Sequence, residues 1–335
     1  MTTSEPAMKV LIYGTGSIGA ACVYLLSKSV PCENIVAICR SNYAVAKQNG
    51  FTINSTTWGN GLVVRPTVVR SVEEALHHKG NGFDYILVTT KATALALGEV
   101  HPIYPAVSPH TTIALMQNGI GIEKPFHKAF PDNPIISAVL YPALAQTAPA
   151  VFSHQLLDRI VLGTFPAEAS ASHKHTATKL SQMLAEGGAA AEHHDDVQIE
   201  RWKKVLINAS ENPICALSRL PDTQFFLSAE GAIDFMKDVM MEISATARAA
   251  GYLGITDDVV DSQLRLLTSR PLPGVAPSMM QDAIAGRQME DDAIIGNVVE
   301  IARANGVSTP ILCTLYYLVH GLNVSFKGGV GEVAR

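Results

Sequence analysis

Residues 9–19 have the sequence Lys9-Val10-Leu11-Ile12-Tyr13-Gly14-Thr15-Gly16-Ser17-Ile18-Gly19. A short apolar run thus leads into a G-x-G-x-x-G loop, and an apolar helical run, residues 20–26, follows. The first glycine of such a loop permits a tight turn, the second lets a pyrophosphate approach the backbone, and the third lets the helix pack close to the strand. The helix directs its N-terminal N–H groups at the phosphates. With a second apolar run at residues 34–39, the pattern predicts a dinucleotide site at Gly14, Thr15, Gly16, Ser17, Ile18 and Gly19.

The residues after the second apolar run indicate which dinucleotide binds. An acidic residue there typically bonds the ribose hydroxyls of NAD, whereas a cation neutralises the additional phosphate of NADP. This chain has Arg40-Ser41-Asn42. Because a guanidinium can bind a phosphate through two hydrogen bonds and the Ser41 hydroxyl can add a donor, we expect NADPH as the cofactor. The alternative, that Arg40 is a solvated residue at a strand end, stays open.

Length and composition predict a globular protein of two domains. The chain has 335 residues, of which 47% are hydrophobic, enough for two buried cores. A net charge of −5 without a basic cluster argues against a nucleic-acid partner. No apolar run approaches the length needed to cross a bilayer, and residues 1–7 lack the basic start and apolar core of a signal peptide. We therefore expect a cytoplasmic protein with no membrane partner.

The cysteines and histidines indicate neither disulfides nor a metal site. The cysteines are odd in number, lie mostly in apolar runs and have no metal-site spacing. The doublets His77-His78 and His193-His194 lack the third ligand that a metal site would need. We expect no bound metal and reduced core cysteines, which are Cys22, Cys32, Cys39, Cys215 and Cys313.

The order of the apolar runs predicts an α/β fold with a second, all-helical domain. Short strand-like runs alternate with helical stretches as a parallel sheet covered by helices requires, which predicts a Rossmann-type domain at residues 8–194. The runs at 135–141, 150–152 and 159–162 are expected to extend this sheet with antiparallel edge strands. Helical periodicity, broken by Pro213 and four later prolines, predicts a helical domain at residues 195–325. The two ends of the chain, residues 1–7 and 327–335, are expected to be loose.

Two polar residues follow strands that neighbour the glycine loop in the predicted sheet. The run 83–90 ends at Lys91, and the run 111–116 leads to Asn118. Ligands of open α/β sheets gather at the carboxyl ends of the strands. We therefore expect Lys91 and Asn118 on the same edge as the glycine loop.

The predicted helical domain begins with a polar stripe. Lys204, Asn208 and Asn212 are spaced four residues apart, so they share one face of a helix whose other positions are mostly apolar. A functional stripe and an ordinary solvated surface are equally compatible with this spacing, although asparagine is a weak helix former that a plain surface has little reason to use twice. Taken alone, Glu290 fits a solvated carboxylate.

Five motifs together resemble the ketopantoate reductase (2-dehydropantoate 2-reductase) family. The resemblance spans Lys9 to about Val319 and implies a Rossmann domain followed by a helical domain of the 6-phosphogluconate dehydrogenase type, with NADPH bound. The motifs are the glycine loop, Thr89-Thr90-Lys91-Ala92, Gln117-Asn118-Gly119, Trp202-x-Lys204 with Asn208 and Asn212-Pro213, and Ser278-Met279-x-Gln281-Asp282 followed by Glu290.

The resemblance also implies a role for each polar residue. Lys204 is the general acid, and Glu290 lies beside the substrate and the lysine. Asn208 and Asn212 hold substrate hydroxyls, and Ser278 meets the substrate carboxylate. Lys91 and Asn118 flank the nicotinamide end of the cofactor.

The chemistry of carbonyl reduction agrees with a lysine acid. Hydride transfer to a 2-keto carbonyl leaves an alkoxide, which a positioned cation can stabilise and protonate. A lysine with its usual pKa near 10.4 is a poor proton donor at neutral pH. Burial and the Lys91 cation are expected to lower the pKa of Lys204, while Glu290 opposes that shift, and the sign of the net effect stays open.

Three positions depart from the family's pattern. Val275 and Ile295 stand where an asparagine is common, and Asp222 stands where a further substrate-side asparagine is common. An apolar side chain cannot replace an amide hydrogen bond, and a carboxylate repels a carboxylate substrate. These departures predict a preference for a bulkier or less polar 2-keto compound than ketopantoate.

We therefore expect an NADPH-dependent oxidoreductase that acts on a small-molecule keto substrate. Ketopantoate, reduced to pantoate for pantothenate biosynthesis, is the leading candidate. Two alternatives stay open: a paralogue that reduces a different ketone or imine, and a non-catalytic NADP sensor, against which the presence of both Lys204 and Glu290 argues. The apolar run 314–319 fits either a homodimer contact or the core face of the last helix.

Overall fold

The computed structural model describes residues 8–79, 82–92, 101–141, 143–155, 159–326 and 328. The two ends predicted to be loose, residues 1–7 and 327–335, lie outside the described residues except for residue 328. The described chain forms two compact units. The first holds most of residues 8–197, and the second holds residues 198–326 together with Ala92 and residues 118–122.

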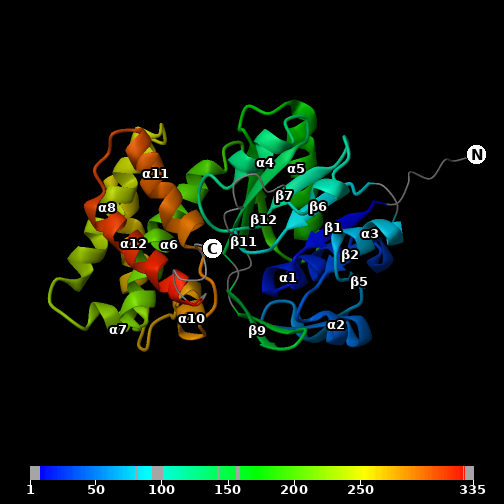
Figure 1. The fold of residues 1–335 in the computed structure, drawn as a ribbon, viewed down its shortest axis with the longest axis horizontal. Helices are drawn as coiled ribbons and strands as arrows, with labels where there is room; N and C mark the ends of the chain where they lie inside the picture. The colour runs from blue at the N-terminus through cyan, green and yellow to red at the C-terminus, as the bar shows by residue number, and fades with distance from the viewer. Residues whose placement is uncertain are drawn as a thin grey trace, which may run out of the picture. The chain divides into compact units, whose positions relative to one another are not determined.

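The first unit is built on an eight-stranded sheet (Figure 1). All neighbouring strands run parallel except β8 and β11, which are antiparallel. The predicted N-terminal α/β domain is thereby confirmed, and β1 lies inside the sheet between β6 and β2. In spatial order the strands are β12 (Ala190–His193), β11 (Arg159–Phe165), β8 (Ile135–Leu140), β7 (Thr112–Leu115), β6 (Tyr85–Val88), β1 (Val10–Tyr13), β2 (Ile35–Ile38) and β5 (Thr67–Val69).

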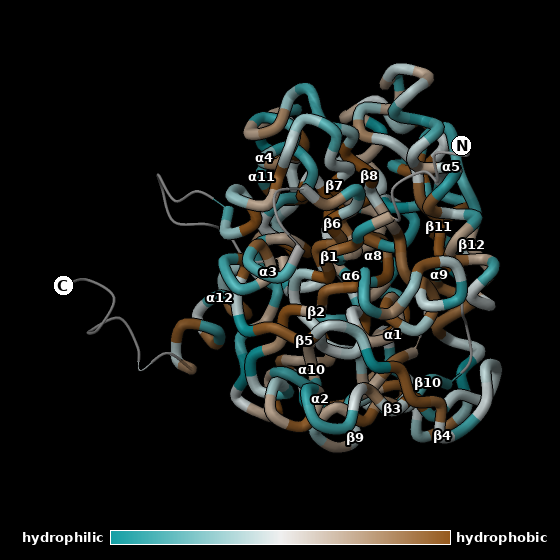
Figure 2. Tube along the Cα trace, turned by 90° about the vertical axis from the view of Figure 1, so that its right-hand side faces the viewer, coloured by the Kyte–Doolittle hydropathy of each residue, from teal (hydrophilic) through white to brown (hydrophobic). Residues whose placement is uncertain are grey.

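The central strands are mostly apolar, as expected for a parallel sheet that is buried on both faces. Every residue of β1, β2, β6 and β7 is buried, and Figure 2 shows β1 as a hydrophobic segment. Alternate strand residues such as Ile12 and Leu87 share one core with the apolar faces of α1 and α5. The helices of this unit are α1 (Ser17–Leu26), α2 (Tyr43–Asn49), α3 (Val72–Lys79), α4 (Glu123–Ala129) and α5 (Ala171–Glu186), with short 3₁₀ turns at Cys32–Asn34 and Tyr104–Ala106.

A separate four-stranded sheet in the first unit corrects one prediction. Its order is β4 (Gly59–Val64), β3 (Phe51–Ser55), β10 (Val151–Gln155) and β9 (Ala143–Ala148). The run at 150–152 therefore joins this sheet, whereas the sequence predicted that it extends the main one. Strand β10 pairs parallel with β3, and Phe152 packs against Phe51 with ring centroids 6.2 Å apart. The predicted antiparallel strand at 159–162 is confirmed, since β11 pairs with β8.

The second unit is helical, as predicted. Its longest helix, α6 (Gln198–Ser218), packs against α8, α9, α10 and α12. The apolar face of α6 carries Trp202, Val205, Leu206 and Ala209 into a core shared with those helices. The other elements are α7 (Asp222–Phe226), α8 (Ala232–Ala249), α9 (Asp257–Thr268), α10 (Ser278–Ile284), a π-helical turn at Asp292–Gly296, α11 (Asn297–Ala304) and α12 (Pro310–Ser325).

Helix α6 continues through Pro213, where the sequence predicted a break. Proline in a helix interior removes one backbone hydrogen bond and costs about 3 kcal/mol. The neighbours Asn212, Ile214 and Cys215 are all buried, so packing of this last part of the helix offsets that cost. The result is one uninterrupted helix that carries Lys204, Asn208 and Asn212.

Candidate functional site

The three glycines of the first loop behave as the sequence predicts. Gly14 has φ of +99°, which favours glycine, and α1 begins at Ser17. A Cβ on Gly19 would collide with the carbonyl oxygen of Gly14 and with Thr89 Oγ1, whereas a Cβ on Gly16 would meet no atom within 4 Å. The loop therefore turns tightly, packs closely under the helix, and leaves open space at Gly16.

Thr15 fastens this loop to the neighbouring strand. Its backbone nitrogen and its Oγ1 both donate to the carbonyl oxygen of Ile38, at 2.9 and 3.0 Å. Since Ile38 is the last residue of β2, the glycine loop is held beside the residues that follow that strand. The backbone of this loop fits a phosphate cradle. Cofactor contact at Gly14 to Gly19 stays a prediction.

The residues directly after β2 line a cavity of about 320 Å³. Arg40 and Ser41 line it, as expected for a phosphate site, and a second cation, Arg70, lines it as well. The guanidinium carbon of Arg70 lies 4.3 Å from the ring centroid of Tyr43, which holds it over the aromatic face. The full lining is Cys39, Arg40, Ser41, Tyr43, Ala44 and Arg70.

Sequence reasoning missed Arg70, although a signal for it exists. Arg70 directly follows β5, which pairs parallel with β2. The same strand-end argument that selected Arg40 therefore applies to Arg70. Two guanidinium groups beside one cavity suit a doubly charged phosphate.

In the second unit, Lys204 lies against Asn118. Lys204 is half-buried on α6, and its Nζ donates to Asn118 Oδ1 at 2.8 Å. The segment that carries Asn118 is fastened to the helical unit, since Arg201 Nη1 donates to the carbonyl oxygen of Gly119 at 2.7 Å. Asn297 Nδ2 donates to the carbonyl oxygen of Ile120, also at 2.7 Å. A predicted polar residue of the stripe and a predicted strand-end amide thus meet.

The environment of Lys204 lowers the pKa of its ammonium group. Burial, together with the Arg201 cation, lowers the pKa of Lys204 to about 7, and the Glu290 carboxylate opposes the shift. The expected direction for burial and for Glu290 is confirmed. The cation that lowers the pKa is Arg201, where the sequence predicted Lys91, which is an exposed residue after β6.

Glu290 lies in a fixed position rather than on an open surface. It is half-buried between α10 and the π-helical turn, and its Oε1 accepts a hydrogen bond from the backbone nitrogen of Ala92 at 2.8 Å. Its charge acts on Lys204, so the two residues predicted for catalysis lie within electrostatic reach of each other. The structure therefore disfavours the alternative of a plain solvated carboxylate.

The predicted substrate residues differ in exposure. Asn208 is half-buried one turn beyond Lys204, and Asn212 is almost fully buried on the same helix. Ser278 is exposed and is the first residue of α10, which packs against α6. Asn208 and Ser278 are accessible to a ligand of this unit, and Asn212 is much less so.

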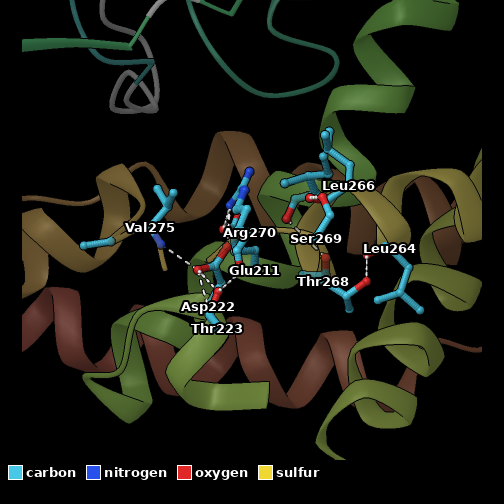
Figure 3. A network of polar contacts seen from close by, with 12 residues as sticks. Glu211, Asp222, Thr223, Leu264, Leu266, Thr268, Ser269, Arg270 and Val275 are labelled. Carbon is cyan, nitrogen blue, oxygen red and sulfur yellow. Dashed lines mark hydrogen bonds and ion pairs between the residues drawn. The ribbon is translucent and has the colours of Figure 1, made fainter. Parts of the chain in front are cut away.

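A buried ionic network adjoins the stripe and was not predicted (Figure 3). Arg270 Nη1 lies 2.6 Å from Glu211 Oε1 and 2.5 Å from Asp222 Oδ2. The other oxygen of Asp222 accepts hydrogen bonds from the backbone nitrogens of Val275, at 2.6 Å, and Thr223, at 2.7 Å. Burial raises the pKa of Glu211 to about 7. Because Arg270 lies far from its two partners in the sequence, no residue spacing predicts the network.

This network and the apolar core correct the interpretation of the three departures. Asp222 is fully buried and paired with Arg270, so it does not present a bare carboxylate to a substrate. Ile295 is fully buried in the apolar core of the helical unit, so it does not line a pocket. Only Val275, 45% exposed, has an accessible side chain. Two of the three premises for a less polar substrate are therefore wrong.

One further group has metal-ligand residue types. Ligand atoms of Asp291, Asp292 and His320 lie within 4.8 Å of one another. His320 Nδ1 lies 2.7 Å from Asp291 Oδ2, and Tyr316 donates to Asp292 at 2.8 Å. These side chains bond one another, so their arrangement is accounted for without an ion.

Two other findings bear on the predictions made from composition. All five cysteines are free, and three of them are buried. Across the residues that the structure describes, every helix is too short or too polar to pass through a lipid bilayer.

Family models match both units of the chain. A model described as "Ketopantoate reductase PanE/ApbA" matches residues 10–167, and one described as "Ketopantoate reductase PanE/ApbA C terminal" matches residues 196–323. The sheet with its glycine loop and the helical unit with its buried lysine thus fall into one class, the two-unit oxidoreductases. The chain belongs to the ketopantoate reductase PanE/ApbA family.

Individual relatives are similar over almost the whole chain. A 2-dehydropantoate 2-reductase of Mesorhizobium japonicum is 26% identical over 95% of this chain and 98% of its own length. An uncharacterised protein of Saccharomyces cerevisiae is 28% identical, with 93% of this chain and 92% of its own covered.

Solved structures share the fold. The crystal structure of 2-dehydropantoate 2-reductase from Methylococcus capsulatus has a TM-score of 0.82 and 31% identity, covering 96% of this chain and 99% of that chain. A ternary structure of D-mandelate dehydrogenase with NADH and anilino(oxo)acetate has a TM-score of 0.80 at 22% identity, covering 96% and 100% of the two chains. At that identity the second likeness shows the fold alone.

The positions of Ile295 and Val275 predict opposite outcomes for the same substitution. Ile295→Asn buries an amide in an apolar core and is expected to lower the free energy of unfolding by about 3 kcal/mol. Val275→Asn, at an exposed position, is expected to change it by less than about 0.5 kcal/mol. Denaturant unfolding of both variants measures this difference. Equal stability of the two variants contradicts the buried placement of Ile295.

Proposed function

We propose that the protein is an NADPH-dependent reductase of a 2-keto acid, with ketopantoate as the first substrate to test. The observation that carries the proposal is the environment of Lys204. Burial lowers the pKa of this lysine to about 7, and its Nζ donates a hydrogen bond to Asn118. A buried ammonium that releases its proton near neutral pH suits the protonation of an alkoxide. Membership of the ketopantoate reductase family supports the same chemistry.

The cofactor assignment rests on residues of the first unit. Gly16 leaves open space at the N-terminus of α1, where a pyrophosphate would receive backbone N–H groups. Arg40 and Arg70 line the cavity that follows β2, where the 2′-phosphate of NADPH would lie. The related fold of D-mandelate dehydrogenase was solved with NADH, so the choice of NADPH rests on the two arginines of this chain.

Several polar residues of the second unit have a role in the proposed reaction. Bound at the glycine loop, NADPH would supply the hydride that reduces the keto carbon and would become NADP⁺. Lys204 Nζ transfers a proton to the carbonyl oxygen as it becomes an alkoxide, which yields the 2-hydroxy acid and a neutral lysine. Asn118 orients the lysine, and Glu290 holds positive charge beside the carbonyl. Asn208 and Ser278 are the accessible donors for substrate hydroxyl and carboxylate.

Cofactor choice is expected to depend on Arg40. A charge-assisted hydrogen bond to phosphate contributes roughly 1.5 to 3 kcal/mol, so Arg40→Ala should weaken NADPH binding by about one to two decades and leave NADH binding nearly unchanged. Arg70→Ala should act in the same direction. Calorimetry with both cofactors measures the effect, and Arg65→Ala, an exposed arginine outside the cavity lining, is the matched control. Equal losses for NADPH and NADH would place Arg40 away from the phosphate.

Lys204 is expected to control both the rate and its pH dependence. Lys204→Ala should lower kcat by about 10²- to 10⁴-fold with NADPH affinity retained, since general acid catalysis contributes that much. Because the donating form is the protonated lysine, kcat/KM for reduction should be constant below pH 7 and fall as pH rises through about 7. The neighbouring Lys203→Ala, which removes only an ion pair to Glu200, is the control. A folded Lys204→Ala variant with less than tenfold loss contradicts the assignment.

A direct activity assay separates this function from its alternatives. NADPH oxidation is followed by absorbance with ketopantoate and with a panel of other keto acids, keto esters and cyclic imines. Turnover of ketopantoate or another 2-keto acid supports the proposal. Turnover only of ketones or imines outside that class indicates a paralogue of different specificity, and NADPH binding without any turnover indicates a sensor.

A further inference from the structure

The guanidinium of Arg270 has an unused face. Its Nη1 contacts both Glu211 and Asp222, while its Nε and Nη2 donate no hydrogen bond to any residue that the structure describes. The side chain is 25% exposed, so this face is accessible. A guanidinium normally binds a carboxylate through two parallel N–H groups, and the Nε–Nη2 edge of Arg270 offers such a pair.

Asp222 and the backbone around it hold this guanidinium in place on the side opposite its free edge. Asp222 is fully buried, and Gly274, with φ of +84°, passes so close to its carboxylate that a Cβ there would collide with Oδ1. Val275 donates its backbone N–H to the same oxygen. Figure 3 shows one end of Arg270 directed at Glu211 and Asp222 and the other end directed away from them. A cation fixed in this way loses little conformational freedom when it binds an anion.

The charge of the network leaves Arg270 able to attract an anion. Glu211 and Asp222 lie close enough to interact, and burial raises the pKa of Glu211 to about 7. When Glu211 is protonated, the charge of the guanidinium is balanced by the Asp222 carboxylate, and the Nε–Nη2 edge keeps its hydrogen-bond donors. The carboxylates therefore orient Arg270 without making the site strongly negative.

Arg270 lies over the same face of α6 as the proposed general acid. Glu211 is seven residues after Lys204, which is two turns of helix, so the two side chains point in nearly the same direction. The rise between them is about 10 Å, with Asn208 in between. When the keto group lies at Lys204, a carboxylate bonded directly to the keto carbon is too far from Arg270 to contact it. A carboxylate several bonds further along the substrate can contact Arg270.

We propose that Arg270 binds a second, distal carboxylate of the substrate, so that the preferred substrates are 2-oxo dicarboxylic acids. The proposal rests on the reductase function, with Lys204 at the keto group and Ser278 available to the nearer carboxylate. It replaces the expectation of a less polar substrate, which assumed that Asp222 is unpaired. Arg270 is then a specificity-determining residue, and Glu211 and Asp222 are its positioning residues.

The test compares substrates that differ only at the distal group. The wild-type protein with NADPH is assayed on 2-oxoglutarate, on its distal amide 2-oxoglutaramate, and on 2-oxovalerate. A bidentate, charge-assisted contact predicts a kcat/KM that is roughly 10- to 100-fold higher for 2-oxoglutarate than for the amide, expressed mainly in KM. Equal kcat/KM for carboxylate and amide overturns the proposal.

Variants of the network test whether the preference for carboxylate over amide comes from Arg270. The variant Glu211→Gln/Asp222→Asn/Arg270→Gln removes the three charges together and leaves no unpaired buried ion. Its preference for carboxylate over amide should fall to near unity, whereas Glu211→Gln/Asp222→Asn, which keeps Arg270, should retain a preference. If the triple variant does not fold, Arg270→Lys, which keeps the charge but lacks the paired donors, should reduce the preference at least severalfold. A preference that persists without Arg270, or that survives Arg270→Lys unchanged, means that Arg270 only stabilises the fold.

A binding measurement separates this proposal from the reductase function. With NADP⁺ bound, no hydride is available, and calorimetry then reports 2-oxoglutarate and 2-oxoglutaramate affinity without turnover. If 2-oxoglutarate binds more tightly than 2-oxoglutaramate and this difference depends on Arg270, the distal site is supported even when no compound is reduced. The absence of any reduction would then reject only the reductase function. Equal affinities for the two compounds reject the distal site even if ketopantoate is reduced.

Discussion

The structure of the helical unit depends on the amphipathic helix α6, which has an apolar face and a polar face. One face carries Trp202 and Leu206 into the apolar core, while another carries Lys204, half-buried, beside Asn118. The core fixes the helix backbone, and the hydrogen bond to Asn118 directs the Lys204 ammonium away from bulk water. Burial is therefore the largest cause of its lowered pKa, and the Glu290 carboxylate restores only part of the lost stabilisation of the charged form. The reactivity proposed for this lysine follows from the packing of the opposite face of the same helix.

Much of the fold could be predicted because its signals are local. A buried parallel strand appears as a continuous apolar run, and the order of such runs gave the main sheet. The glycine pattern predicted a turn at Gly14 and a close approach at Gly19, which are backbone properties of a short segment. The second sheet was missed because its pairing is not local: β10 joins β3 across about a hundred residues, and an apolar run does not state which sheet it enters. The continuation of α6 through Pro213 was missed for a similar reason, since tertiary packing overrides a local preference.

The candidate site was predictable to the same extent. Lys204, Asn118 and Glu290 stand in sequence motifs, and the structure links Asn118 and Glu290 to the lysine through a hydrogen bond and through charge. Two of the missed residues are arginines next to predicted ones: Arg201 lowers the lysine pKa, and Arg70 lines the cavity with Arg40. Arg70 was within reach of the strand-end rule, because β5 ends beside β2. Arg201 was within reach as well, because it stands three residues before Lys204 on α6, and side chains at that spacing are neighbours on a helix.

Departures from a family pattern are unreliable when they are taken one position at a time. Asp222, considered alone, predicts repulsion of an anionic substrate, since a carboxylate replaces an amide. In the structure that charge is neutralised by Arg270, 48 residues later, and its second oxygen holds the backbone of Val275, another departing position. The Asp222 substitution therefore belongs to a set that also includes Glu211 and Gly274, whose missing Cβ leaves room for the carboxylate. Because the guanidinium balances this charge and keeps open donors, Asp222 no longer argues against an anionic substrate once the whole set is considered.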